Sequence, residues 1–217
     1  MTATEHLKRS EESAKRHFAN FEPEFKKFDD FEVLDWRDAD DSNNYYVRYV
    51  FDTKACKLYV SGDLGYGIFA LTWNPTLENT AKHAPYYDYM LEKLSLGCSS
   101  DLYEYCEEVA REELVDQFKS DPERFGDATR HAFDADTTPE RAAQIILEAY
   151  DVRRGIDSAV LNMTHSGDAQ QFIEEFDIDY WEWIGSIGRV IHPRVVAWLI
   201  GLRMAWDIIK CREPAQS

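Results

Sequence analysis

Residues 45–73, YYVRYVFDTKACKLYVSGDLGYGIFALTW, contain the clearest structural pattern in this chain. In the first eight residues two unlike sets of side chains alternate, which is typical of a strand whose two faces differ. A polar break at Thr53–Cys56 leads to a second alternating run, Lys57–Ser61, at hairpin distance. A glycine-rich turn then reverses the chain, because glycine adopts positive φ without steric cost. Ile68–Trp73 returns as a third strand, so the stretch predicts an antiparallel meander of three strands.

The C-terminal region predicts a long buried helix. The run from Pro193 to Lys210 is apolar around most of its circumference, as in a helix packed on several sides. Gly201 within this helix lowers helix stability by about 1 kcal/mol relative to alanine. Its presence there indicates that the backbone packs closely against a neighbour at that position. The predicted fold class is therefore α+β, with the meander packed against several helices that include this one. We expect a single domain over residues 1–217, in which residues 1–20 form a peripheral helix.

Weaker signals predict the remaining elements. Thr4 is the expected cap of the N-terminal helix, and Phe31–Trp36 is predicted as an anchoring segment or an extra strand. The acidic residues of Asp35–Asn44 indicate an exposed loop. Further helices are predicted from Pro85 to Gly97, from Ser100 or Asp101 to about Phe118, and from Thr138 onward. Asp121-Pro122 either ends or restarts the second of these helices.

The composition excludes some partners and favours others. The 217 residues are 44% hydrophobic and 14% aromatic, which is enough for a packed core and argues against global disorder. The net charge of −17 repels nucleic acid and anionic membranes, so we expect no direct binding to either. The same charge favours a basic partner, or simply high solubility. The plainest interpretation is an acidic protein of the cytoplasm.

The cysteines and the terminus agree with a cytoplasmic location. Cys56, Cys98, Cys106 and Cys211 form neither a CxxC pair nor a zinc-ligand spacing, so reduced thiols are expected. The first residues, MTATEHLKRSEESAKRH, are too polar for a signal peptide. The longest apolar run, Val195–Leu202, is too short to span a bilayer.

No motif in the sequence predicts a catalytic residue, a cofactor or a metal. The glycine-rich run Gly62–Gly67 lacks the lysine of a phosphate-binding loop, so a hairpin turn explains it better. His165, Ser166 and Asp168 are too close in sequence to converge as a triad. Asp63 and His83 are kept as an alternative pocket, in which distant side chains would have to meet.

Acidic residues cluster in three segments. Residues 21–44 hold nine acids and three bases, residues 101–127 hold ten and three, and residues 168–182 hold six and none. On a helix, one carboxylate every three to four residues gives a spacing of roughly 4.5–6 Å, loosely comparable with the ~3.4 Å between phosphates along one DNA strand. The predicted partner-binding residues are Asp38, Asp40, Asp41, Asp101, Glu104, Glu108, Glu112, Asp116, Glu174 and Glu175. Ordinary solvated helix faces remain the simpler explanation of such clusters.

Two stretches resemble proteins that prophages and other bacterial mobile elements encode. They are Leu58–Gly65 (LYVSGDLG) and the region from Ile191 (IHPR) through Trp198, Ile200–Leu202 and Met204–Ala205. This resemblance covers well under half of the chain and transfers no catalytic residue. It implies a setting in which small accessory proteins disarm host defences, some of them as acidic anti-CRISPR or anti-restriction mimics of nucleic acid.

These observations lead to one main hypothesis and two alternatives. The main hypothesis is a non-enzymatic inhibitor from a mobile element that binds a basic, nucleic-acid-handling host protein through its acidic surface. The first alternative is a small enzyme or ligand-binding protein with a pocket between the meander and Tyr86–Tyr89, using Asp63 and His83. The second is a homo-oligomer whose interface includes the edge at Trp181–Trp183.

Overall fold

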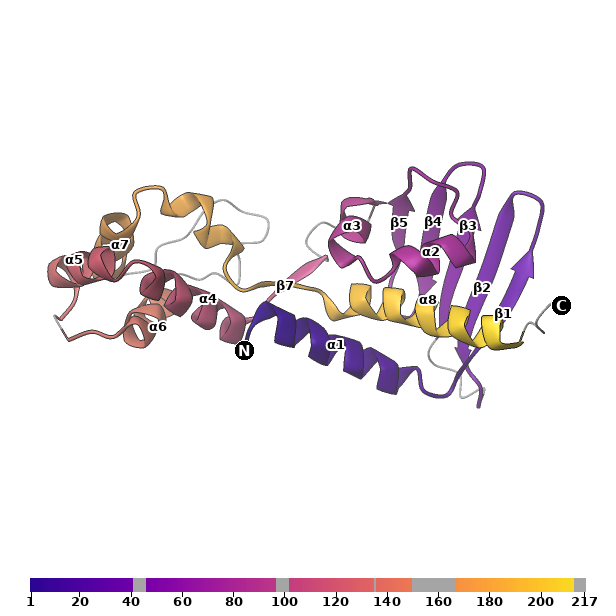
Figure 1. Ribbon diagram of the computed structural model, residues 1–217, viewed down its shortest axis with the longest axis horizontal. Coiled ribbons are helices and arrows are strands. Elements are labelled where there is room, and N and C mark those ends of the chain that lie inside the picture. Colours follow the sequence, from indigo (N-terminus) through magenta and orange to yellow (C-terminus); the bar gives the residue numbers. More distant parts are fainter. Residues whose placement is uncertain (41–45, 97–101, 135, 150–166, 213–217) are drawn as a thin grey trace. The chain divides into compact units, whose positions relative to one another are not determined.

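The computed structural model describes residues 1–40, 46–96, 102–134, 136–149 and 167–212 (Figure 1). The sequence predicts one domain, whereas the chain groups into two compact units. The sheet unit consists of Leu7–Leu102 and Ile191–Ser217, and the helical unit consists of Met1–His6 and Tyr103–Val190. The α+β class is confirmed. Asp41 and Asp101, two of the predicted binding residues, lie outside the described residues.

The sheet unit contains a six-stranded antiparallel sheet in which spatial order follows chain order. Its strands are β1 (Phe21–Lys27), β2 (Phe31–Asp38), β3 (Tyr46–Asp52), β4 (Lys57–Gly62), β5 (Gly67–Ala70) and β6 (Leu94–Leu96). The three predicted strands are β3, β4 and β5, so the predicted meander is the centre of a larger sheet. β1 and β2 extend it on one side, and β6 pairs with β5 on the other.

One face of this sheet forms the core of the unit. Along β3, Val47, Tyr49 and Phe51 are buried, and the residues between them are exposed or half-buried. Leu58 and Val60 on β4 continue this buried face, because Phe51 pairs with Leu58 and Tyr49 with Val60. The alternation in the sequence therefore corresponds to two faces in different surroundings.

The last helix, α8 (Pro193–Arg212), packs on the buried face of the sheet. The Tyr49 hydroxyl donates a hydrogen bond to the carbonyl of Trp198 at 2.7 Å, and burial raises the pKa of this phenol. A Cβ atom added at Gly201 would lie 3.0 Å from Tyr49 Oη, 3.1 Å from Phe18 and 3.2 Å from Trp36. The predicted close packing at Gly201 is confirmed.

The first helix, α1 (Ala3–His17), begins with a reciprocal cap. The Thr2 hydroxyl accepts a hydrogen bond from Glu5 N at 3.2 Å, and the Glu5 carboxylate accepts one from Thr2 N at 2.9 Å. This is a capping box, so the cap is Thr2 rather than the predicted Thr4. Ala14 in the helix and Phe18 just after it are buried.

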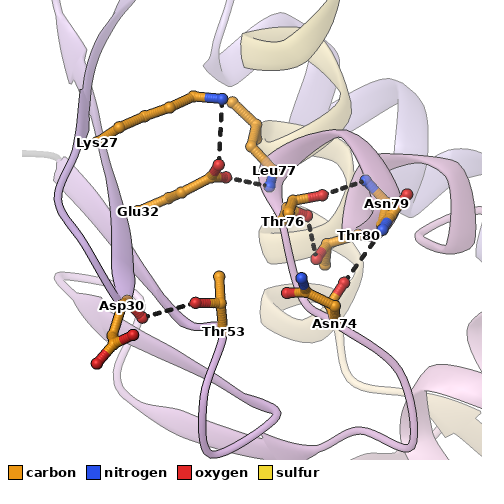
Figure 2. A network of polar contacts seen from close by, with 9 residues as sticks. All are labelled: Lys27, Asp30, Glu32, Thr53, Asn74, Thr76, Leu77, Asn79 and Thr80. Atoms are coloured by element: carbon orange, nitrogen blue, oxygen red, sulfur yellow. Dashed lines mark hydrogen bonds and ion pairs between the residues drawn. The ribbon is translucent and has the colours of Figure 1, made fainter.

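Two short helices, α2 (Leu77–His83) and α3 (Tyr87–Glu92), connect β5 to β6. Glu32 reaches the start of α2 from β2, where it is only 7% exposed. Its carboxylate accepts a hydrogen bond from Leu77 N at 2.7 Å and lies 3.2 Å from Lys27 Nζ (Figure 2). Thr76 caps the same turn through a 3.2 Å hydrogen bond from Asn79 N. A strand and a helix are thereby joined by a charge-assisted contact at the helix N-terminus.

The helical unit is built from packed helices around an aromatic core. Its helices are α4 (Glu107–Ser120), α5 (Pro122–Ala132), α6 (Pro139–Ala149) and α7 (Gly167–Phe176), followed by the short turns η3 (Tyr180–Glu182) and η4 (Ile184–Ser186). Phe118 meets Phe172 edge-to-face at 5.3 Å and Phe176 at 5.1 Å between ring centroids. Asp121-Pro122 restarts the chain as α5, with the Asp121 side chain accepting from Arg124 N at 3.1 Å.

Candidate functional site: the acidic helical unit

The net charge is divided very unequally between the two units. The sequence of the helical unit contains 22 acidic and 8 basic residues, a net charge of −14. The sequence of the sheet unit contains 19 acidic and 16 basic residues, a net charge of −3. The two values add to the −17 of the whole chain, so the helical unit carries most of the negative field.

The bases of the helical unit do not remove this excess. Four cations form ion pairs with nearby acids: Arg111 with Glu107 at 3.1 Å, Lys119 with Glu140 at 2.7 Å, Arg124 with Asp121 at 3.4 Å, and Arg130 with Asp127. The Lys119 contact lowers the pKa of the Glu140 carboxyl. Arg189 instead lies over the ring of Tyr103, 3.8 Å from its centroid. The acids of the helical unit therefore still outnumber its basic side chains.

On α4 the predicted stripe is three residues long. Glu108 and Asp116 are exposed, and Glu112 is half-buried and contacts the amino group of Met1. A spacing of four residues places these carboxylates on one face, about 6 Å apart along the helix axis. Ala110, Leu114 and Phe118 occupy the buried face, as predicted.

The predicted helix from Ser100 or Asp101 begins later, at Glu107, because the preceding residues form a strand. β7 (Tyr103–Tyr105) pairs with β8 (Arg189–Ile191), and Cys106 N donates to the Gly188 carbonyl at 2.8 Å. Gly188 has φ +73°, and a Cβ atom there would lie 2.6 Å from Ala110. Glu104 therefore belongs to a strand, where its carboxylate lies 3.6 Å from His6 Nε2.

The two predicted acids on α7 are exposed. Glu174 and Glu175 point away from the buried residues Phe172, Ile173 and Phe176, which fill the core of the unit. Glu174 accepts a hydrogen bond from the Gln170 side chain at 2.8 Å, and no cation pairs with either acid in the described part of the chain. Both therefore add to the negative surface.

An open pocket in the helical unit brings acids from separate segments together. Its volume is about 600 Å³. Asp134 and Asp136 reach it from the connection between α5 and α6, and Asp168 reaches it from the start of α7. His131 and Arg141 line it as well. These acids were not among the predicted binding residues, because two of them stand outside the three acidic clusters of the sequence.

The predicted acids near β2 belong to the sheet unit and differ in exposure. Asp35, expected in an exposed loop, is a buried residue of β2 and pairs with Arg48 through contacts of 2.6 and 2.9 Å. The loop prediction was wrong from Asp35 to Asp38, because β2 continues through these residues. Asp38 ends β2 and accepts a hydrogen bond from Asp40 N at 3.1 Å, and Asp40 is exposed.

The alternative pocket residues have separate structural contacts. Asp63 lies in the turn between β4 and β5, and its carboxylate accepts a hydrogen bond at 2.8 Å from the backbone N–H of Tyr46 at the start of β3. His83 Nδ1 is 2.8 Å from the Asn79 carbonyl, and because a carbonyl only accepts, this nitrogen carries a proton. The His83 ring stacks on Trp73 with centroids 4.4 Å apart. Neither Asp63 nor His83 lines the 600 Å³ pocket.

One residue of the edge predicted as an oligomer interface, Trp183, makes its contacts inside the helical unit. Trp183 packs against the aromatic core, and its Nε1 donates to the Asp177 carboxylate at 2.8 Å. The side chain of Trp181 lies outside the described residues. In the sheet unit, Arg212 near the end of α8 contacts Glu22 on β1.

Within the described residues, no group of three His, Cys, Asp or Glu side chains is arranged to hold a metal ion. The described cysteines, Cys56, Cys106 and Cys211, are free thiols. None of the described helices combines the length and apolar character that crossing a membrane requires. Comparison with protein-family models, with curated proteins and with solved structures gives no match.

Proposed function

We propose that this protein is a non-enzymatic inhibitor or interaction protein whose helical unit binds a basic surface on a nucleic-acid-handling protein. The observation that carries the proposal is the net charge of −14 on the helical unit, against −3 on the sheet unit. The charge is therefore a property of one part of the molecule and not of its whole surface. A general requirement for solubility gives no reason for such a division.

The physical basis is competition for a cationic groove. Duplex DNA carries one negative charge about every 1.7 Å along its axis, and its binding proteins meet this charge with Lys and Arg. Carboxylates about 6 Å apart on α4 present a sparser field of the same sign. Complementary charge would speed encounter with the partner and make the rate fall as salt increases. The partner in this proposal is a basic protein, and the chain itself binds neither nucleic acid nor membrane.

The cellular setting is the second part of the proposal. The stretches from Leu58 to Gly65 and from Ile191 to Ala205 resemble proteins of prophages and mobile elements. In that setting the basic partner would be a host defence protein in the cytoplasm, such as a CRISPR effector, and the protein would act as an anti-CRISPR-like mimic of nucleic acid.

A capture experiment tests this proposal. The immobilised full chain is incubated with bacterial lysate at about 50 mM salt, and bound proteins are eluted with duplex DNA or with about 500 mM salt. The proposal predicts that the captured proteins are basic nucleic-acid binders and that both DNA and salt release them. Capture of proteins that DNA does not displace would contradict the mimicry.

A further inference from the structure

The helices of the sheet unit cover one face of its sheet (Figure 1). On that face, Tyr49 of β3 donates to α8, and the Glu32 carboxylate of β2 accepts from the start of α2. The end of α1 lies against α8 at Gly201, and Tyr87 of α3 donates a hydrogen bond to α1 at 2.8 Å. We call the opposite face of strands β1 to β5 the open face, since no described helix of this unit lies on it.

An apolar row crosses the open face, perpendicular to the strands. Val33 on β2 pairs with Val50 on β3, and Val50 pairs with Tyr59 on β4. Tyr59 pairs in turn with Ile68 on β5, and all four residues are half-buried. Side chains that stand opposite each other on one face of a sheet lie close enough to touch. The solvated face of an antiparallel sheet ordinarily carries polar residues, so a continuous apolar row is typical of a face that packs against another surface.

Exposed aromatic side chains extend this apolar area to both ends of the open face. Phe31, the first residue of β2, is 41% exposed, and Tyr46, the first residue of β3, is 40% exposed. β2 and β3 are antiparallel, so these two rings lie at opposite ends of the face. Phe28 is more exposed still and adjoins Phe31 in the hairpin, where its N–H donates to the Phe31 carbonyl at 2.7 Å. A contiguous exposed apolar patch on a soluble protein marks a site of interaction.

The charged side chains of the open face balance one another. β1 contributes two acids and one base to this face, β2 and β3 contribute one of each, and β4 contributes one base. The strands thus place four charges of each sign there, and the net charge is zero. Asp35 contacts Arg48 at 2.6 and 2.9 Å and Arg37 at 3.6 Å, so some of these charges also pair directly. In a chain of net charge −17, this face is electrically neutral.

A neutral apolar face fits a second copy of the same chain better than it fits a charged partner. Two copies, each of net charge −17, repel each other. At the open face this repulsion is smallest, because the charges there sum to zero. A strongly basic or acidic partner gains no net attraction from such a face. Two-fold dimers, in which one patch meets its own copy, are also the commonest homo-oligomers.

The area of the open face is sufficient for a weak dimer. Strands lie about 4.8 Å apart and rise about 3.4 Å per residue, so five strands of about six residues cover about 24 Å by 20 Å, or roughly 500 Å². Two copies in contact would bury roughly 1,000 Å² in total, which is the lower limit for a specific interface. Obligate dimers bury about 2,000 Å² or more, so we expect exchange between monomer and dimer.

We propose that the open face is the contact surface of a homodimer, in which two sheets pack face to face about a two-fold axis. The apolar row of each copy lies at the centre of the contact, and charged side chains lie at its rim, as in protein interfaces generally. This inference is independent of the proposed function, because it uses the sheet unit and no acid of the helical unit.

The test is sedimentation equilibrium of the full chain between about 5 and 500 μM, a range that brackets the affinity expected for an interface of this size. We expect a reversible monomer–dimer equilibrium with a dissociation constant between about 10 and 100 μM. Raising the salt from about 50 to 500 mM should tighten the dimer about threefold or more, because salt screens the repulsion between the two negative chains. Binding to a basic partner weakens with salt, so the sign of the salt effect separates the two interactions.

Three variants locate the contact. Val50→Lys places a charge at the centre of the apolar row and is expected to weaken the dimer at least about tenfold. Phe31→Lys changes a more exposed residue of the same face, so it provides a second test if Val50→Lys does not fold. Ile178→Lys, at a 75% exposed residue of the helical unit, makes the same change in charge and is the matched control. This control should dimerise like the parent, and circular dichroism checks that each variant is folded.

Three results would each overturn the proposal. A chain that remains monomeric up to about 500 μM at both salt concentrations has no such interface. A dimer that persists in folded Val50→Lys and Phe31→Lys, or that is lost equally in Ile178→Lys, does not use the open face. A dimer that weakens as salt increases is held by charge and not by a neutral face.

Discussion

At the scale of single residues, the surroundings decide what a side chain contributes. Gly201 in α8 and Gly126 in α5 are both helical glycines, and intrinsic propensity treats them alike. Their neighbours differ completely. Tyr49, Phe18 and Trp36 lie within 3.2 Å of a Cβ atom added at Gly201, whereas nothing lies within 4 Å of one added at Gly126.

The same substitution should therefore have opposite effects at these two positions. Gly126→Ala is expected to stabilise by about 0.5–1 kcal/mol, because alanine is the better helix former. Gly201→Ala gains the same propensity but overpacks the core, which typically costs about 1–3 kcal/mol, so we expect a net loss of stability. Urea denaturation of both variants measures this, and a shift of the same sign in both would contradict the packing at Gly201.

The pair formed by Asp35 and Arg48 predicts a dependence of stability on pH. Burial alone would raise the pKa of Asp35, but the hydrogen-bonded guanidinium of Arg48, together with the charges of Arg37 and Lys26, outweighs burial and lowers that pKa below the ordinary value of 3.8. The stabilisation is therefore present above about pH 4 and lost as the pH falls through the lowered value.

Replacing the carboxyl should remove this dependence. Asp35→Asn is expected to cost about 1–2 kcal/mol at pH 7, toward the lower end for a charged pair because Arg48 is 44% exposed. The difference from the parent should shrink between about pH 4 and pH 2. Asp40→Asn, at an exposed acid, is the control, and an equal loss in both variants at pH 7 would contradict this role of Asp35.

At the scale of elements, Glu32 connects the sheet to the start of α2. A buried carboxylate that accepts a backbone N–H at a helix N-terminus is favoured by both hydrogen bonding and the helix dipole. Glu78, inside α2, is by contrast exposed and pairs with Lys82 at 2.7 Å. Both glutamates make contacts at α2, but Glu32 is buried and Glu78 is exposed.

Replacing each glutamate with alanine measures its separate contribution to the free energy of unfolding. Glu32→Ala is expected to cost about 1–3 kcal/mol, because Leu77 N loses its acceptor in a buried place. Glu78→Ala should change stability by about 0.5 kcal/mol or less, as exposed ion pairs do. Thermal unfolding of both variants tests this, and an equal effect would show that Glu32 does not anchor α2.

The elements also show how far the sequence predicts the fold. β3, β4 and β5 were predictable because their side chains alternate, and α8 was predictable because its apolar residues surround it. β1 gave no clear signal, since FEPEFKK contains a proline and four charges. β7 is three residues long and its partner, β8, lies more than 80 residues away, so the acidic residues before Glu107 were assigned to a helix.

At the scale of the whole molecule, the separation of charge was only partly predictable. Counting acids located the clusters at residues 101–127 and 168–182, and apart from residues 101 and 102 both fall in the helical unit. No stretch of linker-like composition marks the boundary between the units in the sequence. The unequal charges of the two units could therefore not be predicted without the contacts that define the units. Asp134 and Asp136 join Asp168 only through the fold.

We propose that the helical unit recognises a basic partner by charge. The most direct test of this proposal is the affinity of the captured partner for two variants with the same change in net charge. One carries Glu108→Lys, Asp116→Lys and Glu175→Lys in the helical unit, which avoids Glu104 and Glu112 because these already have partners. The other carries three exposed sheet-unit substitutions: Glu12→Lys, Asp29→Lys and Glu92→Lys.

We expect the helical-unit variant to lose at least about 100-fold in affinity and to show a flatter dependence of affinity on salt. The sheet-unit variant should remain within about threefold of the parent, and circular dichroism should confirm that both variants are folded. Equal losses in the two variants would mean that net charge alone matters, and undiminished binding by the helical-unit variant would contradict the account.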